Sequence, residues 1–232
     1  MCYKPLTQMA GGVPVPLPTR AEDQFTLTAD SLRAAITPRT KLLILPYPNN
    51  PTGAIMTRDE LQAIATVIKD TNIVVLSDEI YNSLTYGPDR HVCFAELDGM
   101  KERTIVVDGF SKSYAMTGWR IGYSLAPEHI TKVMSNYVSH STAAPSTLSQ
   151  WAAVEALTGP QDTVETMRQA FEQRRNYMVE RVNSMELVSC LKPEGAFYIF
   201  MNIRKTGMTS AEFCSYAIDK YRLALIPGDA FG

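Results

Sequence analysis

The chain has 232 residues, of which 45% are hydrophobic and 20% charged, and its formal net charge is −2. These values are typical of a globular protein with a sizeable core, and they give no electrostatic footprint for nucleic acid or an acidic membrane surface. No apolar run approaches the roughly 18 residues of a membrane span, so we expect neither partner and a cytoplasmic location. The four cysteines and three histidines lack ligand spacing, which predicts reduced thiols and no metal site.

In chain order, the first half alternates predicted helices and strands. Thr28 is expected to cap a short helix, after which the apolar run 42–45 predicts a buried strand. The segment 57–60 fits a capping box at the start of a second helix, and the runs 73–76 and 104–107 predict two more strands. The second helix is expected to bury Leu61, Ile64, Ala65 and Ile68. Because the strands are continuously apolar, we expect an α/β fold, with a mostly parallel sheet and helices on both faces.

The second half is predicted to be richer in helices and to form a separate unit. The predicted helices are 145–157, 161–184 and 211–220, and the predicted strands are 187–191, 196–201 and 223–226. The inner side of the longest helix is expected to carry Val164, Met167, Phe171, Met178 and Val182, with its charged residues facing solvent. We therefore expect a larger α/β domain over 1–160 and a smaller α+β domain over 161–232.

Four polar residues stand at or just past the ends of the predicted strands: Asn50, Asp78, Tyr81 and Lys112. Ligands of open α/β sheets bind at the carboxyl ends of the strands, where loops bring side chains together. Taken alone, Asp78 is better explained as a helix cap or loop carboxylate, and Tyr81 as a half-buried core aromatic. Together with Lys112, the set favours one shared site.

The order and spacing of three motifs carry a family resemblance. Asn50-Pro51-Thr52-Gly53 is followed 28 residues later by Asp78, which opens Asp-Glu-Ile-Tyr, and 34 residues after that by Lys112. Ser111-Lys112 precedes the run 116–123, Met-Thr-Gly-Trp-Arg-Ile-Gly-Tyr, which nothing in folding requires after a lysine. The set resembles the active site of class I and II aminotransferases, enzymes of fold type I that use pyridoxal 5′-phosphate. The resemblance covers essentially the whole chain, including the run 194–198.

The resemblance implies a role for each strand-end residue. Lys112 would form a Schiff base with the cofactor and then move the proton of the substrate α-carbon. Asp78 would keep the pyridine nitrogen protonated, so that the ring can accept electrons. A charge pair about 3 Å apart at an effective dielectric of about 20 has a gross energy of roughly 5 kcal/mol. Tyr81 and Asn50 would donate to the phenolate oxygen of the ring.

Phosphate binding is the point at which the sequence departs from the family pattern. Gly109 stands where many relatives carry a phosphate-binding serine, three residues before the lysine. Arg120 would therefore pair with the phosphate through a charge-assisted fork, with Ser111 as a weaker candidate.

The predicted activity is transfer of an amino group between an L-amino acid and a 2-oxo acid, by a homodimer. The run 9–16 near the start resembles a mid-domain segment of these enzymes, and the chain stops in the turn-rich segment 227–232 without a terminal helix, so we expect a fragment. In the family, the phosphate loop and the aromatic that stacks on the ring would precede it, and the arginine that binds the substrate carboxylate would follow it.

Other functions stay open at this stage. Fold type I also includes β-lyases and cyclopropane-carboxylate synthases, and regulatory proteins carry aminotransferase-like domains. A catalytically incomplete fragment is a further alternative. The substrate stays open too, although Tyr137, His140 and Ser141 could line the site, with His140 better explained as a structural residue.

Overall fold

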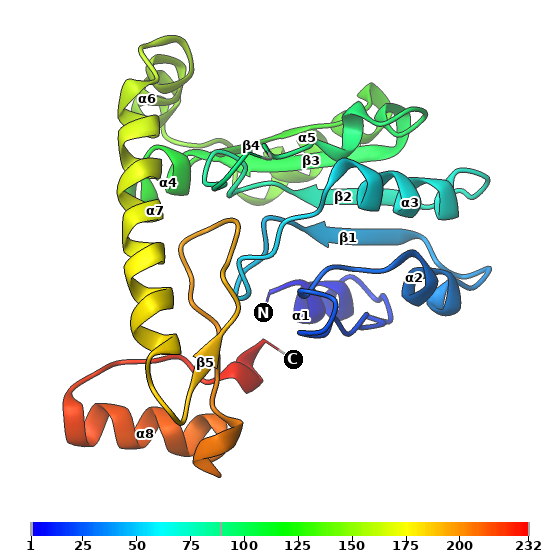
Figure 1. Cartoon of the computed structure of the whole chain (residues 1–232). Coiled ribbons are helices and arrows are strands. Elements are labelled where there is room, and N and C mark those ends of the chain that lie inside the picture. Colours follow the sequence, from blue (N-terminus) through cyan, green and yellow to red (C-terminus); the bar gives the residue numbers. More distant parts are fainter. Residues whose placement is uncertain (1, 89, 232) are drawn as a thin grey trace.

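The computed structural model describes residues 2–88 and 90–231 and has a four-stranded sheet at its centre, in the order β1-β2-β3-β4. β1 (Leu42–Pro46), β2 (Val74–Asp78) and β3 (Thr104–Gly109) are parallel, and β4 (Gly122–Leu125) runs antiparallel to β3 (Figure 1). The three predicted strands are confirmed, with ends shifted by at most two residues. β4 was not predicted, because its sequence Gly-Tyr-Ser-Leu has no continuous apolar run.

The helices that belong with the sheet are α1 (Tyr3–Met9), α2 (Ala29–Ala35), α3 (Arg58–Ile68), α4 (Phe110–Ser113), α5 (Glu128–Ser141) and α6 (Thr147–Thr158). In Figure 1, α3 lies in front of the sheet and α5 behind it. The structure is thus the α/β fold with a mostly parallel sheet that the apolar runs predict. None of the helices in the described part of the chain is both long and apolar enough to cross a membrane.

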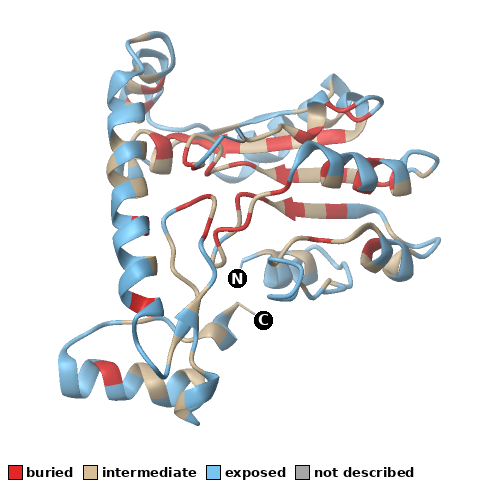
Figure 2. Cartoon of the chain, viewed as in Figure 1, coloured by how far each residue is buried: buried red, intermediate tan, exposed pale blue. Residues whose placement is uncertain are grey.

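The main core forms where α3 packs on β1 and β2. The capping box is confirmed, because Thr57 N–H donates to Glu60 Oε2 at 2.7 Å and Glu60 N–H donates to Thr57 Oγ1 at 3.3 Å. The predicted stripe is also confirmed, since Leu61, Ile64, Ala65 and Ile68 are buried. Figure 2 shows buried residues concentrated along the strands and on the inner side of α3. This packing holds the carboxyl ends of the strands in place.

The rest of the chain consists of α7 (Asp162–Asn183), β5 (Ser189–Cys190), β6 (Met201–Asn202) and α8 (Ser210–Tyr221). Residues 223–226 form no strand. The predicted strand 187–191 is reduced to Ser189 and Cys190, and only Met201 of the predicted strand 196–201 lies in a strand. Between them, Glu194 and Gly195 donate their N–H groups to Gly53 O, at 3.0 and 2.8 Å, and Ala196 N–H donates to Leu84 O at 2.8 Å. The residues 193–198, here called the 193–198 loop, therefore bond to the large sheet unit instead of pairing with each other.

The inner side of α7 differs from the prediction at two positions. Val182 is buried as expected, but Met178 is 43% exposed and Arg175 is buried in its place. The Arg175 guanidinium donates to Pro193 O at 2.9 Å and lies over the Tyr86 ring, 4.7 Å from its centroid. A guanidinium can be buried here because carbonyl and carboxylate groups, including Glu194 at 3.3 Å, satisfy its donors. Arg175 thereby fixes the 193–198 loop against α7.

Candidate active site

The ends of the parallel strands meet at one edge of the sheet. In the register, Pro46 of β1 lies opposite Asp78, and Asp78 lies opposite Val107 of β3. Asn50 follows β1 by a few residues, and Lys112 follows β3 on α4. The structure thus brings the strand-end residues to a common edge, where the 193–198 loop approaches them.

Lys112 presents a half-buried amine at this edge. Gly109 ends β3 and begins the short helix α4, which turns the chain so that Lys112 lies beside the 193–198 loop. Its Nζ lies 5.6 Å from the centroid of the Phe197 ring. Within residues 2–88 and 90–231, Nζ forms no hydrogen bond or ion pair. An amine held by an aromatic face and by no carboxylate is available to an incoming ligand.

Asp78 is the carboxylate of the site, and Tyr3 holds it. The Ile80 N–H donates to Asp78 Oδ1 at 3.3 Å, and the Tyr3 hydroxyl donates to Oδ2. Burial raises the pKa of Tyr3, and the hydrogen bond to Asp78 and the charge of Asp78 raise it further. Tyr3 therefore stays a protonated donor, which orients the side chain of Asp78. Sequence reasoning missed Tyr3, because its partner lies 75 residues away and no motif surrounds it.

Tyr81 and Asn50 meet at a third side chain, Tyr198. Asn50 Nδ2 donates to the Tyr198 hydroxyl at 3.1 Å, and the hydroxyls of Tyr81 and Tyr198 are hydrogen bonded. Burial raises the pKa of Tyr81, and the contacts with Tyr198 and the charge of Asp78 add to the rise. Tyr81 is therefore a donor rather than a phenolate at neutral pH. Its ring lies 5.5 Å, centroid to centroid, from the ring of Phe197, which connects it to the Lys112 side of the site.

Among the residues that the structure describes, the side chains of Arg120 and Ser111 form no hydrogen bond or ion pair with the other predicted site residues. Arg120 is exposed in a left-handed backbone conformation with φ of 50°, and its Nη1 donates to Thr117 O at 3.0 Å. Ser111 is half-buried on α4. Their predicted role in binding phosphate stays a prediction, and both lie within nine residues of Lys112, as the motif requires.

A second carboxylate, Asp108, lies buried just before Lys112. It accepts hydrogen bonds from Asn82 Nδ2 at 2.7 Å, the Tyr123 hydroxyl at 2.8 Å and Gly109 N–H at 2.6 Å. Burial raises the pKa of Asp108, and these three donors only partly offset that effect. Because Asn82 follows β2 and Tyr123 lies on β4, Asp108 joins three segments behind the lysine. We assign it a structural task.

Glu79, next to Asp78, is the most buried carboxylate near the site at 2% exposure. Its oxygens are bonded to the Ser77 hydroxyl at 2.8 Å, His91 Nε2 at 2.7 Å and Phe94 N–H at 3.2 Å. Burial raises the pKa of Glu79, but the hydrogen bond and charge of His91, with Ser77 and Cys93, outweigh it and hold the net pKa below its ordinary value. Glu79 thus connects the end of β2 to residues 91–94 as a charged group.

Glu79→Gln is expected to weaken the fold in a pH-dependent way. A carboxyl with a lowered folded-state pKa stabilises the fold above its unfolded pKa, about 4.3, and loses this effect as pH falls through the folded pKa. At pH 7 the variant should be less stable by about 1–3 kcal/mol, and the difference should shrink below about pH 4. Urea denaturation across this range measures both free energies. Parallel curves for parent and variant would contradict the assignment.

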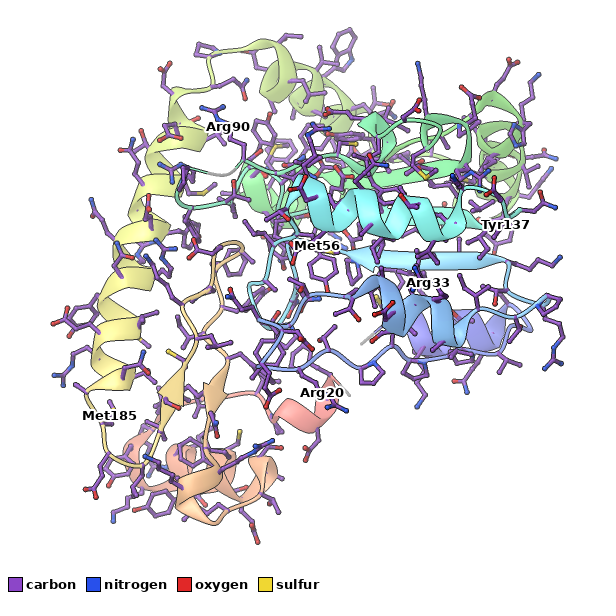
Figure 3. The ribbon with its side chains drawn as sticks, turned by 45° about the vertical axis from the view of Figure 1, so that its right-hand side comes forward. Arg20, Arg33, Met56, Arg90, Tyr137 and Met185 are labelled. Carbon is purple, nitrogen blue, oxygen red and sulfur yellow. The ribbon has the colours of Figure 1, made fainter. Side chains whose placement is uncertain are left out.

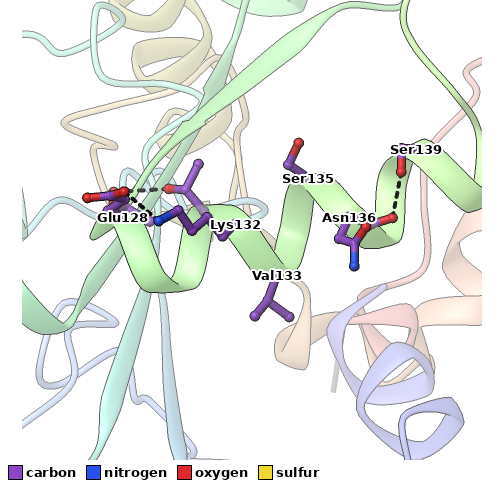
Figure 4. A pocket seen from close by; sticks show the side chains of 8 residues that line it. Glu128, Lys132, Val133, Ser135, Asn136 and Ser139 are labelled. Carbon is purple, nitrogen blue, oxygen red and sulfur yellow. Dashed lines mark hydrogen bonds and ion pairs between the residues drawn. The ribbon is translucent and has the colours of Figure 1, made fainter.

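A shallow hollow along α5 lies elsewhere. Its lining includes Glu128, Lys132, Asn136 and Ser139 (Figure 4), and none of its lining residues belongs to the strand-end set. Tyr137 is 75% exposed and points outward at the side of the molecule away from α7 (Figure 3). His140 and Ser141 are also exposed on α5, and the suggestion that these three residues line the site stays a prediction.

Comparison with known proteins agrees with the geometry. A family model described as aminotransferase class I and II matches residues 2–232. The chain is 44% identical over 236 residues to the aspartate aminotransferase of Geobacillus stearothermophilus, covering 99% of the chain and 60% of that protein. It is 43% identical over 232 residues to aromatic-amino-acid aminotransferase 2 of Thermococcus litoralis, covering 99% and 59%.

Solved structures are similar as well. The aromatic aminotransferase from Pyrococcus horikoshii superposes with a TM-score of 0.96 at 43% identity, with 99% of this chain and 62% of that chain covered. An aspartate aminotransferase from Thermus thermophilus, determined with maleate, superposes with a TM-score of 0.94 at 35% identity, with 99% and 60% covered. The chain thus spans about 60% of the length of the curated relatives that it matches.

Proposed function

Because the chain belongs to the aminotransferase class I and II family, we propose that it carries the lysine side of a pyridoxal 5′-phosphate-dependent aminotransferase site. The substrates would be an L-amino acid and a 2-oxo acid. The observation that carries the proposal is the Lys112 amine, which lies against Phe197 without a carboxylate partner, at the sheet edge that also bears Asp78.

The residues at this edge fit the cofactor chemically. An aldehyde needs an accessible amine, and Lys112 Nζ makes no hydrogen bond or ion pair in the described chain. A protonated pyridine nitrogen needs a fixed carboxylate, and Tyr3 and Ile80 hold Asp78. A phenolate oxygen needs donors, which Asn50 and Tyr81 supply. For the phosphate, we propose Arg120, with Ser111 as its neighbour on α4.

When bound, pyridoxal 5′-phosphate supplies an aldehyde that reacts with amines and a ring that accepts the electron pair left at the substrate α-carbon. Lys112 would supply the amine that holds the cofactor through its aldehyde, and its Nζ would hold and move the α-proton of the substrate. Asp78 would hold the proton on the ring nitrogen through charge. Tyr81 and Asn50 would donate hydrogen bonds to the phenolate oxygen of the ring.

Borohydride trapping tests the proposal directly. After the purified chain is incubated with pyridoxal 5′-phosphate and reduced with sodium borohydride, peptide mapping by mass spectrometry should find the label on Lys112. Lys112→Ala should lose the label. Lys132→Ala should keep it, because that side chain is 73% exposed on α5 and pairs with Glu128. Label spread over surface lysines, or none, would contradict the proposal.

We also propose that the intact protein is a cytoplasmic homodimer built from the two units predicted, 1–160 and 161–232. The separate sheets support the division, since β1–β4 fall in the first unit and β5–β6 in the second. Four free cysteines agree with a reducing compartment. Sedimentation equilibrium of the cofactor-loaded intact protein would return a monomer if the dimer proposal is wrong.

A further inference from the structure

The 193–198 loop delivers one more hydroxyl to the strand ends, that of Tyr198. Three backbone hydrogen bonds hold the loop against the large sheet unit: Glu194 and Gly195 N–H to Gly53 O, and Ala196 N–H to Leu84 O. In the same segment, Ala196 O accepts a hydrogen bond from the Tyr86 hydroxyl. Tyr198 follows this anchored stretch by two residues, so its ring is set by the backbone contacts of the loop.

The Tyr198 hydroxyl lies between the two donors proposed for the phenolate oxygen. It accepts from Asn50 Nδ2 at 3.1 Å and is hydrogen bonded to the Tyr81 hydroxyl. The rings of Tyr81 and Tyr198 meet edge to face, with centroids 5.7 Å apart and an interplanar angle of 81°. Asn50 and Tyr81 come from the ends of different strands, and Tyr198 is the side chain that joins them.

The hydrogen count at this junction leaves donors free. An amide has two N–H hydrogens, and each tyrosine hydroxyl has one hydrogen and two lone pairs. If Tyr198 accepts one hydrogen from Asn50 and donates its own to Tyr81, then the second Asn50 hydrogen and the Tyr81 hydrogen both remain available. In this arrangement both hydrogens belong to side chains that meet at Tyr198.

We propose that Tyr198 is a positioning residue that orients Asn50 and Tyr81 as a pair of donors toward the hydroxyl-derived oxygen of the cofactor ring. This inference rests on the proposed function. The competing arrangement has Tyr198 occupying the acceptor position itself, as a phenol standing in for the ring oxygen. In that arrangement Tyr198 would compete with the cofactor. Removal of its hydroxyl would then strengthen cofactor binding, whereas removal of the hydroxyl of a positioning residue would weaken it.

Two ligands that differ by the ring hydroxyl separate these roles. Pyridoxal 5′-phosphate carries the oxygen, and 3-deoxypyridoxal 5′-phosphate lacks it. Tyr198→Phe should weaken equilibrium binding of the first by about three- to tenfold, the effect of loosening one or two hydrogen bonds. Binding of the second should change less than about twofold. Tyr216→Phe is the matched control, because the Tyr216 hydroxyl accepts from Lys220 Nζ at 3.0 Å on α8, outside the site.

A double-variant cycle gives a second test if Tyr198→Phe lowers stability. In a Tyr81→Phe background, Tyr198→Phe should weaken pyridoxal 5′-phosphate binding less than it does in the parent, because one of the donors that it positions is already gone. Additive losses would mean that Tyr198 acts independently of Tyr81, which would overturn the inference.

The other outcomes are equally distinct. Equal weakening of both ligands would assign Tyr198 a structural role, and tighter binding of pyridoxal 5′-phosphate by Tyr198→Phe would show that it competes; either result overturns the inference while the proposed function stands. A parent chain that binds neither ligand and takes no label on Lys112 would remove the proposed function, and the role of Tyr198 with it.

Discussion

Replacement of Asp78 by asparagine is expected to slow amino-group transfer by the cofactor-loaded protein by about a thousandfold. The carboxylate would stabilise the positive ring nitrogen, and a gross interaction of roughly 5 kcal/mol, reduced by desolvation to about 4 kcal/mol, corresponds to this factor. Asparagine keeps the shape and one oxygen but carries no charge. Single-turnover rates with an amino acid in excess, followed through the absorbance of the cofactor, measure the effect.

The same variant should still be labelled at Lys112 after borohydride reduction, because the lysine does not contact Asp78 through any hydrogen bond in the described chain. If Lys112 is still labelled while amino-group transfer is slow, the variant is folded, and the slower rate reflects the lost charge of Asp78. A variant that transfers amino groups at the parent rate would show that Asp78 does not serve the ring nitrogen.

Tyr3 connects this expectation to the N-terminal helix. Its hydroxyl occupies one oxygen of Asp78, so loss of that hydroxyl should affect the same step in the same direction but less, by about three- to tenfold. Tyr137→Phe is a suitable comparison, because Tyr137 is exposed and its hydroxyl lies away from the site. We therefore expect the loss of transfer rate to be largest for Asp78→Asn, smaller for Tyr3→Phe and absent for Tyr137→Phe. This order tests whether Tyr3 acts through Asp78.

The strand ends could be predicted from sequence, whereas their partners could not. Apolar runs and the capping box at Thr57 are local patterns, and the end of an apolar run predicts where the strand ends. The Asp78–Tyr3 and Asn50–Tyr198 contacts join residues 75 and 148 positions apart. No periodicity encodes such pairs, since they depend on how α1 and the 193–198 loop pack.

Buried charge was the other feature that patterns missed. Arg175 is a charged residue that the hydrophobic stripe of the longest helix assigns to solvent, yet it is buried because carbonyl and carboxylate groups satisfy its donors. Glu79 is also buried, because hydroxyl and imidazole partners satisfy its oxygens. The predicted strand 196–201 begins with a similar long-range contact. The N–H of its first residue, Ala196, donates to Leu84 O, which lies far away in the sequence.

Gly53→Ala is expected to destabilise the fold by about 2–4 kcal/mol. Gly53 has φ of +68°, which costs an alanine about 1 kcal/mol, and the added Cβ would overlap Pro193 Cβ and lie 2.8 Å from Gly195 O. Neither neighbour can retreat easily, because Glu194 and Gly195 N–H both donate to Gly53 O. Urea denaturation of parent and variant measures the loss.

Gly99→Ala is the matched control for backbone strain alone. Gly99 has φ of +72° but no heavy atom within 4 Å of an added Cβ, so its alanine variant should lose only about 1 kcal/mol. The difference between the two variants isolates the contact between Gly53 and the 193–198 loop. Equal losses would mean that the loop moves aside at little cost. If the loop is instead held as firmly as its hydrogen bonds indicate, Gly53→Ala should also displace Tyr198 and weaken binding of pyridoxal 5′-phosphate, whereas Gly99→Ala should leave binding unchanged.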